Sequence, residues 1–322
     1  MNRIDPAVWR QQVWRNRLQS LILLAVMALF LVLLGHLLWG GDGVVMLLVL
    51  GVFAVLFNPT ISPWLVMRMY GATPLDPRQV PALWQVVARL AERADLPRPP
   101  RLFYVPSLAL NAFAVGSRES PAIGVTDGLL RQLDLRELAG VLAHEISHIR
   151  SNDLWVMGLA DLFSRATSVL SLLGQLLLFI NLPLILFADV HVNWFAVLLL
   201  VFAPTLSALA QLALSRTREF DADLNAARLT GDPDGLARAL VKIEQVQGGW
   251  LERVFLPGRR VPEPSLLRTH PRTEERVARL MELKPQWPDD EALFDVIDSA
   301  WMWPETQRVS RPPRWHISGL WY

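Results

Sequence analysis

The chain has 322 residues, of which 52% are apolar and 19% are charged. Soluble domains contain about 45–50% apolar and about 25% charged residues, so this composition excludes a wholly soluble protein. The net charge of +1 gives no basis for nucleic-acid binding, and the absence of cysteine excludes disulfides, thiol catalysis and cysteine-bound metal.

Four apolar stretches without a formal charge account for the excess of apolar residues. Each is longer than the roughly 20 residues that cross a bilayer, and they cover 18–41, 43–67, 166–188 and 190–215. They predict four transmembrane helices in two hairpins, 18–67 and 166–215, the first preceded by a basic amino terminus, 1–17. Pro59 and Pro63 predict a kinked or interfacial end to the second stretch. A buried soluble hairpin is the alternative interpretation.

The positive charges predict the orientation of these helices. Neither hairpin tip, at 40–43 or at 189–193, contains lysine or arginine, and all 31 basic residues lie on the other side of the four stretches. By the positive-inside rule, both termini and all the soluble segments are expected in the cytoplasm.

The soluble part falls into two blocks, residues 68–165 and 216–286, followed by a tail, 287–322. Periodicity and turn signals predict helices at 80–94, 216–229 and 235–246, and short strands at 101–105, 112–116 and 122–125. Asp134 and Glu137 form a capping box, which predicts a further helix running to about Arg150. The expected fold is mainly α with a small β-sheet (α+β), attached to a multi-pass membrane protein.

The capped helix contains the pattern His144-Glu145-Ile146-Ser147-His148. Histidines four residues apart project from one face of a helix, so both imidazoles can reach one tetrahedral zinc ion. Glu145 lies beside them and can take a proton from water. A surface helix with two unremarkable histidines is the alternative.

A catalytic zinc of this type needs a third protein ligand, and no third histidine follows at short spacing. Glu219 is the best candidate, and Asp223 lies four residues later on the same predicted helix. Asp223 could hold a ligand imidazole through its second nitrogen. Taken alone, an acidic pair at this spacing is more often a solvated helix face.

Together these features resemble the membrane-embedded zinc endopeptidases of the HtpX heat-shock protease type, a group that includes the CAAX prenyl proteases. The resemblance extends to about residue 285 and implies a gluzincin-like protease domain. Besides the two hairpins, it rests on Asn111-Ala112-Phe113-Ala114, on His144–His148 followed by Asp153, on Arg218-Glu219-Phe220 with Ala222-Asp223, and on Thr269-His270-Pro271 with Arg276.

The resemblance implies a role for most of the matched positions. His144, His148 and Glu219 would bind one Zn²⁺ per chain, Glu145 would be the general base, and Asp223 would orient a ligand histidine. Asn111, Ala112, Phe113 and Ala114 would form an edge strand that pairs with an extended substrate. His270 would face the scissile carbonyl and stabilise the oxyanion. No clear role follows for Asp153 and Arg276, for which a structural salt bridge is the simpler interpretation.

The implied function is hydrolysis of misfolded or damaged membrane proteins, or of unfolded polypeptides, at the cytoplasmic face of a bacterial inner membrane. The expected partners are these substrates and the lipid bilayer, with a homo-oligomer or membrane quality-control partners left open. A narrow-specificity processing protease of the CAAX type and a non-catalytic zinc-binding scaffold are the alternatives. The tail, with five of the thirteen tryptophans, has no assigned role, and docking on the chain's own domain is the default expectation.

Overall fold

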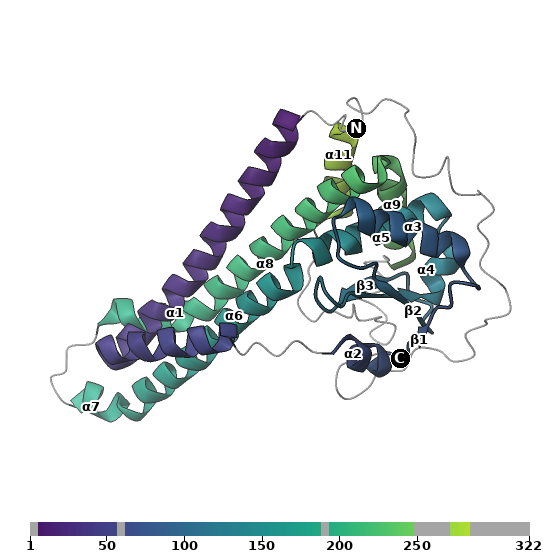
Figure 1. Cartoon of the computed structure of the whole chain (residues 1–322). Helices are drawn as coiled ribbons and strands as arrows, with labels where there is room; N and C mark the ends of the chain where they lie inside the picture. Colours follow the sequence, from purple (N-terminus) through teal and green to yellow (C-terminus); the bar gives the residue numbers. More distant parts are fainter. Residues whose placement is uncertain (1–5, 57–61, 188–192, 248–270, 284–322) are drawn as a thin grey trace. The chain divides into compact units, whose positions relative to one another are not determined.

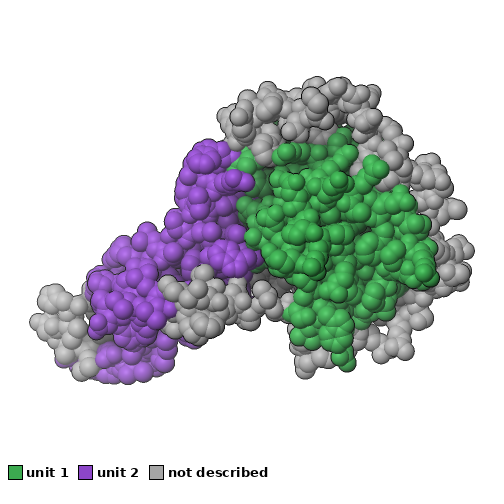
Figure 2. Space-filling model, in the orientation of Figure 1, with its two compact units in different colours: residues 1–13, 60–154, 218–322 green, residues 14–59, 155–217 purple. Residues whose placement is uncertain are grey.

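The computed structural model describes residues 6–56, 62–187, 193–247 and 271–283. The chain divides into two compact units, which Figure 2 shows in different colours. Unit 1 contains Met1–Val13, Thr60–Leu154 and Arg218–Tyr322, and unit 2 contains Trp14–Pro59 and Trp155–Thr217. Each unit is therefore assembled from segments that are distant in the sequence.

The first helix, α1 (Pro6–Leu56), is bent within the glycine-rich segment that was predicted to be a hairpin tip. Trp39 and Gly40 leave the helical conformation, and Gly40 has a positive φ of 61° that an L-residue with a side chain rarely adopts. The two arms then come into close contact, because a side chain at Gly43 would collide with the backbone carbonyl of Gly35. Small residues at these positions allow the tight reversal.

The arms of α1 pack in unit 2 against α6 (Asp153–Ile180) and α8 (Trp194–Thr230) (Figure 1). Two clusters of buried side chains join the three helices: Leu31, Leu34, Leu47, Leu170, Leu200 and Ala203 in one, and Met27, Ala160, Ala210 and Leu214 in the other. Large apolar side chains on the same helices are exposed, among them Leu29, Leu172, Phe179, Phe195 and Phe202. Helices that are apolar both inside and outside a bundle are typical of membrane proteins.

In the described part of the chain, three helices are long and apolar enough to cross a membrane, namely Val13–Val49, Asp153–Ile180 and Trp194–Thr230. The four predicted spans are therefore not confirmed. The second predicted stretch, 43–67, is divided between the second arm of α1, which ends at Leu56, and the short helix α2 (Pro63–Met69) in unit 1. A further short helix, α7 (Leu182–Phe187), follows α6.

Unit 1 contains a four-stranded mixed sheet with the strand order β1-β2-β4-β3. The strands are β1 (Thr73–Pro74), β2 (Arg101–Val105), β3 (Ala112–Val115) and β4 (Ala122–Thr126). β2 pairs in parallel with β4, and β3 pairs with β4 in the antiparallel direction. Since β4 is its only neighbour among the described residues, β3 is an edge strand.

Helices pack around this sheet and enclose the main hydrophobic core of unit 1 (Figure 1). They are α3 (Pro81–Arg93), α4 (Asp127–Gln132), α5 (Leu135–Arg150), α9 (Pro233–Gln247) and α11 (Thr273–Glu282). The mainly helical fold with a small sheet agrees with the prediction from the sequence.

Helix α5 lies at the centre of this core. Its capping box is formed as predicted, with the Glu137 amide donating to Asp134 Oδ1 at 2.8 Å and the Asp134 amide donating to Glu137 Oε2 at 3.0 Å. Its close packing on α9 requires Gly140, because a Cβ there would lie 2.8 Å from the backbone of Leu236. These contacts fix the position of the helix that carries the predicted metal ligands.

Candidate metal centre

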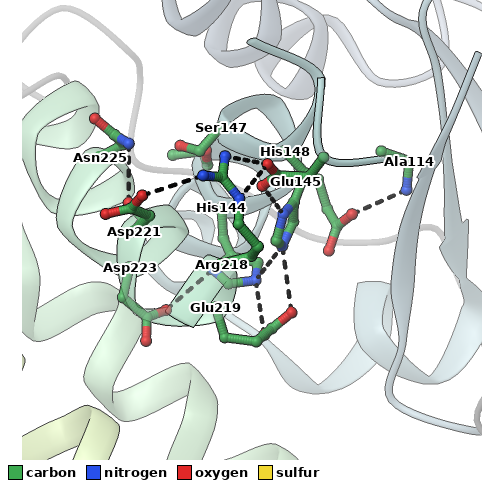
Figure 3. Close-up of polar contacts among 12 residues, drawn as sticks. Ala114, His144, Glu145, Ser147, His148, Arg218, Glu219, Asp221, Asp223 and Asn225 are labelled. Carbon is green, nitrogen blue, oxygen red and sulfur yellow. Dashed lines mark hydrogen bonds and ion pairs between the residues drawn. The ribbon is translucent and has the colours of Figure 1, made fainter. Parts of the chain in front are cut away.

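Two histidines and a glutamate from two helices converge inside unit 1 (Figure 3). His144 and His148 lie one turn apart on α5, and Glu219 lies on α8. One ligand atom from each residue lies within 4.8 Å of the other two, and all three residues are buried. The structure therefore brings together the three residues that the sequence predicted as metal ligands.

The spacing of the three ligand atoms fits a tetrahedral zinc site. His144 Nε2 lies 3.0 Å from His148 Nε2, and Glu219 places one carboxylate oxygen 3.4 Å from His144 Nε2 and the other 3.5 Å from His148 Nε2. Zinc–ligand bonds of about 2.0–2.1 Å in tetrahedral geometry separate neighbouring ligands by about 3.3 Å. No side chain needs to move far to bind the ion.

His144 is held from its other ring nitrogen by a carboxylate and an arginine. Its Nδ1 lies 3.0 Å from Asp223 Oδ1, as the sequence predicted for Asp223. Arg276 donates to both oxygens of Asp223, from Nε at 2.7 Å and from Nη2 at 2.6 Å. Its Nη1 also lies 3.6 Å from Glu219 Oε2. Burial lowers the pKa of Arg276, but the charge of Asp223 and the hydrogen bonds to it outweigh burial and raise it.

His148 is held by a second set of the same composition. Its Nδ1 lies 2.7 Å from Asp153 Oδ2, and Arg218 donates to Asp153 Oδ1 from Nε at 2.6 Å and also from Nη2. Arg218 also contacts Asp221 at 3.4 Å. Each of the two histidines is thus contacted at Nδ1 by an aspartate, which in turn pairs with an arginine.

These contacts determine the tautomer of both histidines. A carboxylate can only accept a hydrogen bond, so each Nδ1 carries the proton and each neutral ring presents a lone pair on Nε2. When both rings are neutral, these two lone pairs, 3.0 Å apart and facing a glutamate, can hold a cation between them. Burial lowers the pKa of His144, but hydrogen bonds to Asp223 and Glu219 and the charge of Glu219 raise it to about 9. The site therefore attracts positive charge.

The charges around the cluster support the same conclusion. Five buried carboxylates lie in this part of unit 1, those of Glu145, Asp153, Glu219, Asp221 and Asp223. Arg218 contacts Asp153 and Asp221, and Arg276 contacts Glu219 and Asp223. Buried carboxylates are costly unless cations or protons neutralise them. A divalent cation held by two nitrogens and one carboxylate fits the donor set.

Glu145 lies next to this cluster and contacts the edge strand (Figure 3). Its Oε2 accepts a hydrogen bond of 2.9 Å from the backbone N–H of Ala114 in β3. The Ala114 N–H therefore points away from β4 and toward the free edge of the sheet. Glu145, the residue expected to act as the base, thus contacts the strand on which a substrate was expected to pair and lies on the same helix as both histidines.

The predicted substrate segment has the expected strand geometry. Ala112, Phe113 and Ala114 belong to β3, and Asn111 precedes it, donating its N–H to Thr126 Oγ1 at 3.0 Å. The ring of Phe113 packs on Gly124, where a side chain would meet the ring at 2.7 Å, so Phe113 contributes to the sheet rather than to a free surface. Since side chains and backbone groups alternate along a strand, Ala112 and Ala114 present their N–H and C=O groups to the same edge.

Some residues around the site were not assigned from the sequence, and others that were assigned lie outside the described part of the chain. From the sequence, only a structural salt bridge was expected for Asp153 and Arg276, and Arg218 was named in the matched motif without a role of its own. Both arginines do form ion pairs with aspartates, Arg218 with Asp153 and Arg276 with Asp223. A buried carboxylate expected near a predicted metal ligand is the signal that could have identified Asp153. His270 and the tryptophan-rich tail, 287–322, lie outside the described residues.

The chain is similar in sequence to proteins of a known family. A model of Peptidase family M48 matches residues 77–284. A Protease HtpX homolog from Acaryochloris marina is 37% identical over 298 residues, covering 84% of this chain and 96% of that protein. One from Methylibium petroleiphilum is 33% identical over 294 residues, covering 84% and 99%. The crystal structure of S. mikatae Ste24p is 21% identical with a TM-score of 0.42, covering 84% of this chain and 66% of that one.

The resemblance to HtpX-type proteases is thus confirmed by whole-length relatives, and the family match includes α5 and the part of α8 that holds Glu219. With three candidate membrane helices and a buried His–His–Glu cluster, the chain belongs to peptidase family M48, a family of metal-dependent proteases.

Proposed function

We propose that the protein is a zinc endopeptidase of the membrane, with His144, His148 and Glu219 as the zinc ligands and Glu145 as the general base. The observation that carries the proposal is the position of Glu145, which lies on the same helix as both histidines and contacts the edge strand. A structural zinc site needs no such carboxylate, because its ligands close the coordination shell. One Zn²⁺ per chain is expected.

The chemistry divides between the metal and this carboxylate. When bound, zinc acts as a Lewis acid that makes water more acidic and polarises a peptide carbonyl. Glu145 takes the proton from the attacking water on a carboxylate oxygen and passes it to the nitrogen of the leaving amine. The amide of Ala114 holds Glu145 Oε2, so the second oxygen of Glu145 is the one oriented for proton transfer. His270 remains the proposed donor to the oxyanion.

The free edge of β3 is the proposed substrate-binding element. The N–H and C=O of Ala112 and the C=O of Ala114 point to this edge, whereas the N–H of Ala114 is bonded to Glu145. An extended peptide can add as a further strand through these groups, with hydrogen bonds that do not depend on its sequence. Such binding favours unfolded segments over folded proteins, and it supports misfolded or damaged membrane proteins as substrates.

The proposed location is a bacterial inner membrane, with four spans and with both termini and the zinc site in the cytoplasm. The distribution of all 31 lysine and arginine residues away from the two hairpin tips supports this orientation. The ligands His148 and Glu219 lie just before α6 and within α8, the two helices that continue into candidate membrane spans. A site at this position would act on loops near the membrane surface.

Metal dependence and substrate range test the proposal together. The detergent-purified full chain should contain about one zinc per chain, cleave unfolded casein, lose cleavage with a chelator and regain it with zinc. In cells, loss of the protein should lower the levels of many membrane-protein fragments and raise the levels of the uncut proteins. Changes confined to one or a few proteins would instead indicate a processing protease, and zinc binding without any cleavage would indicate a scaffold.

A further inference from the structure

The aspartate and arginine that support His148 come from a different pair of helices than those that support His144. Asp223 and Arg276, which hold His144, lie on α8 and α11, whereas Asp153, which holds His148, is the first residue of α6. Its partner Arg218 lies on α8. The ion pair Asp153–Arg218 therefore joins the start of one candidate membrane helix to the other.

The short turn between α5 and α6 directs Asp153 back to the metal cluster. Only Ser151 and Asn152 separate the two helices, and the positive φ of 52° at Asn152 interrupts the helical conformation between them. Asparagine tolerates this left-handed conformation better than most residues. As a result, Asp153 Oδ2 meets Nδ1 of His148, a residue in the last turn of α5.

Both oxygens of the Asp153 carboxylate are used. Oδ2 accepts from His148 at 2.7 Å, and Oδ1 accepts from Arg218 through Nε at 2.6 Å and through Nη2. Asp153 is buried, and the Arg218 side chain is only 11% exposed. Loss of Arg218 would leave a buried aspartate with its charge uncompensated on one side, and it would then no longer be held against His148.

We propose that Asp153 and Arg218 are a positioning pair for the metal ligand His148, and that zinc retention depends on the contact between α6 and α8 that they form. This inference rests on the proposed zinc site and adds that the contact between the two helices determines how tightly the site holds zinc. Any change in the membrane helices that separates Asp153 from Arg218 releases His148 and weakens metal binding. By thermodynamic reciprocity, bound zinc stabilises the contact between the two helices.

The first test measures zinc affinity rather than cleavage, by competition with a chromogenic chelator on the full chain in detergent. Arg218→Gln and Asp153→Asn should each weaken zinc binding about 10- to 100-fold, as loss of a group that supports a metal ligand typically does. Arg218→Lys should recover part of the affinity, because it keeps the charge without the planar fork. The Co²⁺-loaded variants should show altered visible absorption, which a general loss of stability would not produce.

Arg136 provides the matched control. It forms an ion pair of similar length with Asp232, from Nε to Oδ2 at 2.8 Å, between α5 and the residue before α9, but its side chain is half exposed and the pair lies outside the His–His–Glu cluster. Arg136→Gln should leave the zinc affinity and the Co²⁺ spectrum unchanged. Circular dichroism and a thermal midpoint above the assay temperature confirm that each variant is folded. If Arg218→Gln does not fold, Arg218→Lys replaces it in the test.

The second test asks whether bound zinc stabilises the contact between α6 and α8. Zinc removal from the wild-type protein should increase hydrogen exchange of the amides around 154–158 and 216–220, while the amides of α3 should be unaffected. In Arg218→Gln, exchange at the first two segments should be high with or without zinc. Unchanged zinc affinity and unchanged exchange in Arg218→Gln would overturn the inference, even if the wild type is a zinc protease. Conversely, weakened zinc binding in a protein that cleaves nothing would support the pair and refute the proposed function.

Discussion

The Glu145 carboxylate accepts a hydrogen bond of 2.9 Å from the backbone amide of Ala114. This contact links the proposed general base to the edge strand that is expected to bind substrate. It also gives the two outward amides of β3 different roles, since that of Ala112 is available to a peptide and that of Ala114 positions the base.

Proline substitutions separate these two roles. Proline removes an N–H donor and is tolerated on an edge strand where that N–H points outward. Ala112→Pro should raise KM about 3- to 10-fold with little change in kcat, because one hydrogen bond to substrate, worth about 0.5–1.5 kcal/mol, is lost. Ala114→Pro should mainly lower kcat, because Glu145 loses its donor. Steady-state kinetics with an unfolded substrate measure both, and the same KM and kcat changes in the two variants would contradict the assignment.

Glu219 is expected to be essential for metal binding. Glu219→Gln replaces a charged ligand by a neutral amide and leaves two histidines to hold the ion. Zinc affinity should fall by more than the roughly 10- to 100-fold loss that follows removal of a supporting carboxylate. The measurement is zinc content after dialysis against a weak chelator. Glu244→Gln, at an exposed position of α9, is the control and should retain the metal.

Arg276 is expected to contribute strongly to stability, because it is buried and bonded to Asp223 through two nitrogens. Removing one partner of a buried ion pair costs about 3–5 kcal/mol, so Arg276→Met should lower the thermal midpoint by several degrees and weaken zinc binding through His144. Arg89→Met, at an exposed site on α3, should change neither. A stable Arg276→Met protein with normal zinc content would show that Asp223 does not need its arginine.

Gly140 is expected to limit how α5 packs on α9. A methyl group at this position would lie 2.8 Å from the Leu236 backbone, so Gly140→Ala forces the two helices apart and should cost about 1–3 kcal/mol. Because α5 carries two of the three proposed ligands and the proposed base, cleavage should fall as well. Gly158→Ala is the matched control: it lies in helix α6 with nothing within 4 Å, so it should be neutral or stabilising. Equal thermal midpoints for the two variants would contradict this packing.

The residues that the sequence identified at the site are those whose relationship is local. Histidines four apart on a helix with a strong cap share a face, and Glu219 and Asp223 share a face for the same reason. The pairing of Asp153 with Arg218 joins residues 65 positions apart, and no local spacing predicts it. The same limit applies to Arg276 and Asp223, which are brought together only when α11 packs beside α8.

In the fold, too, the features with a local sequence pattern were predicted and those that depend on distant segments were not. The strands at 101–105, 112–116 and 122–125 and the capped helix follow from local periodicity, and the structure contains each within a residue. The strand order, which makes β3 an edge, depends on the parallel pairing of β2 with β4 and has no local signature. The apolar stretch 43–67 was long enough to span a membrane, but α1 ends at Leu56 and a separate short helix, α2, begins at Pro63.

The most direct test of the account is the substitution Glu145→Gln, assayed for zinc content and for cleavage in the same preparation. Glutamine keeps the size of the side chain and can still accept from the Ala114 amide, but it cannot take a proton from water. The variant should hold one zinc per chain, as in the wild type, and should lose cleavage by at least about 100-fold, in line with removal of a general base. Glu92→Gln, an exposed glutamate on α3, should retain both. Full cleavage by Glu145→Gln would contradict the proposed mechanism.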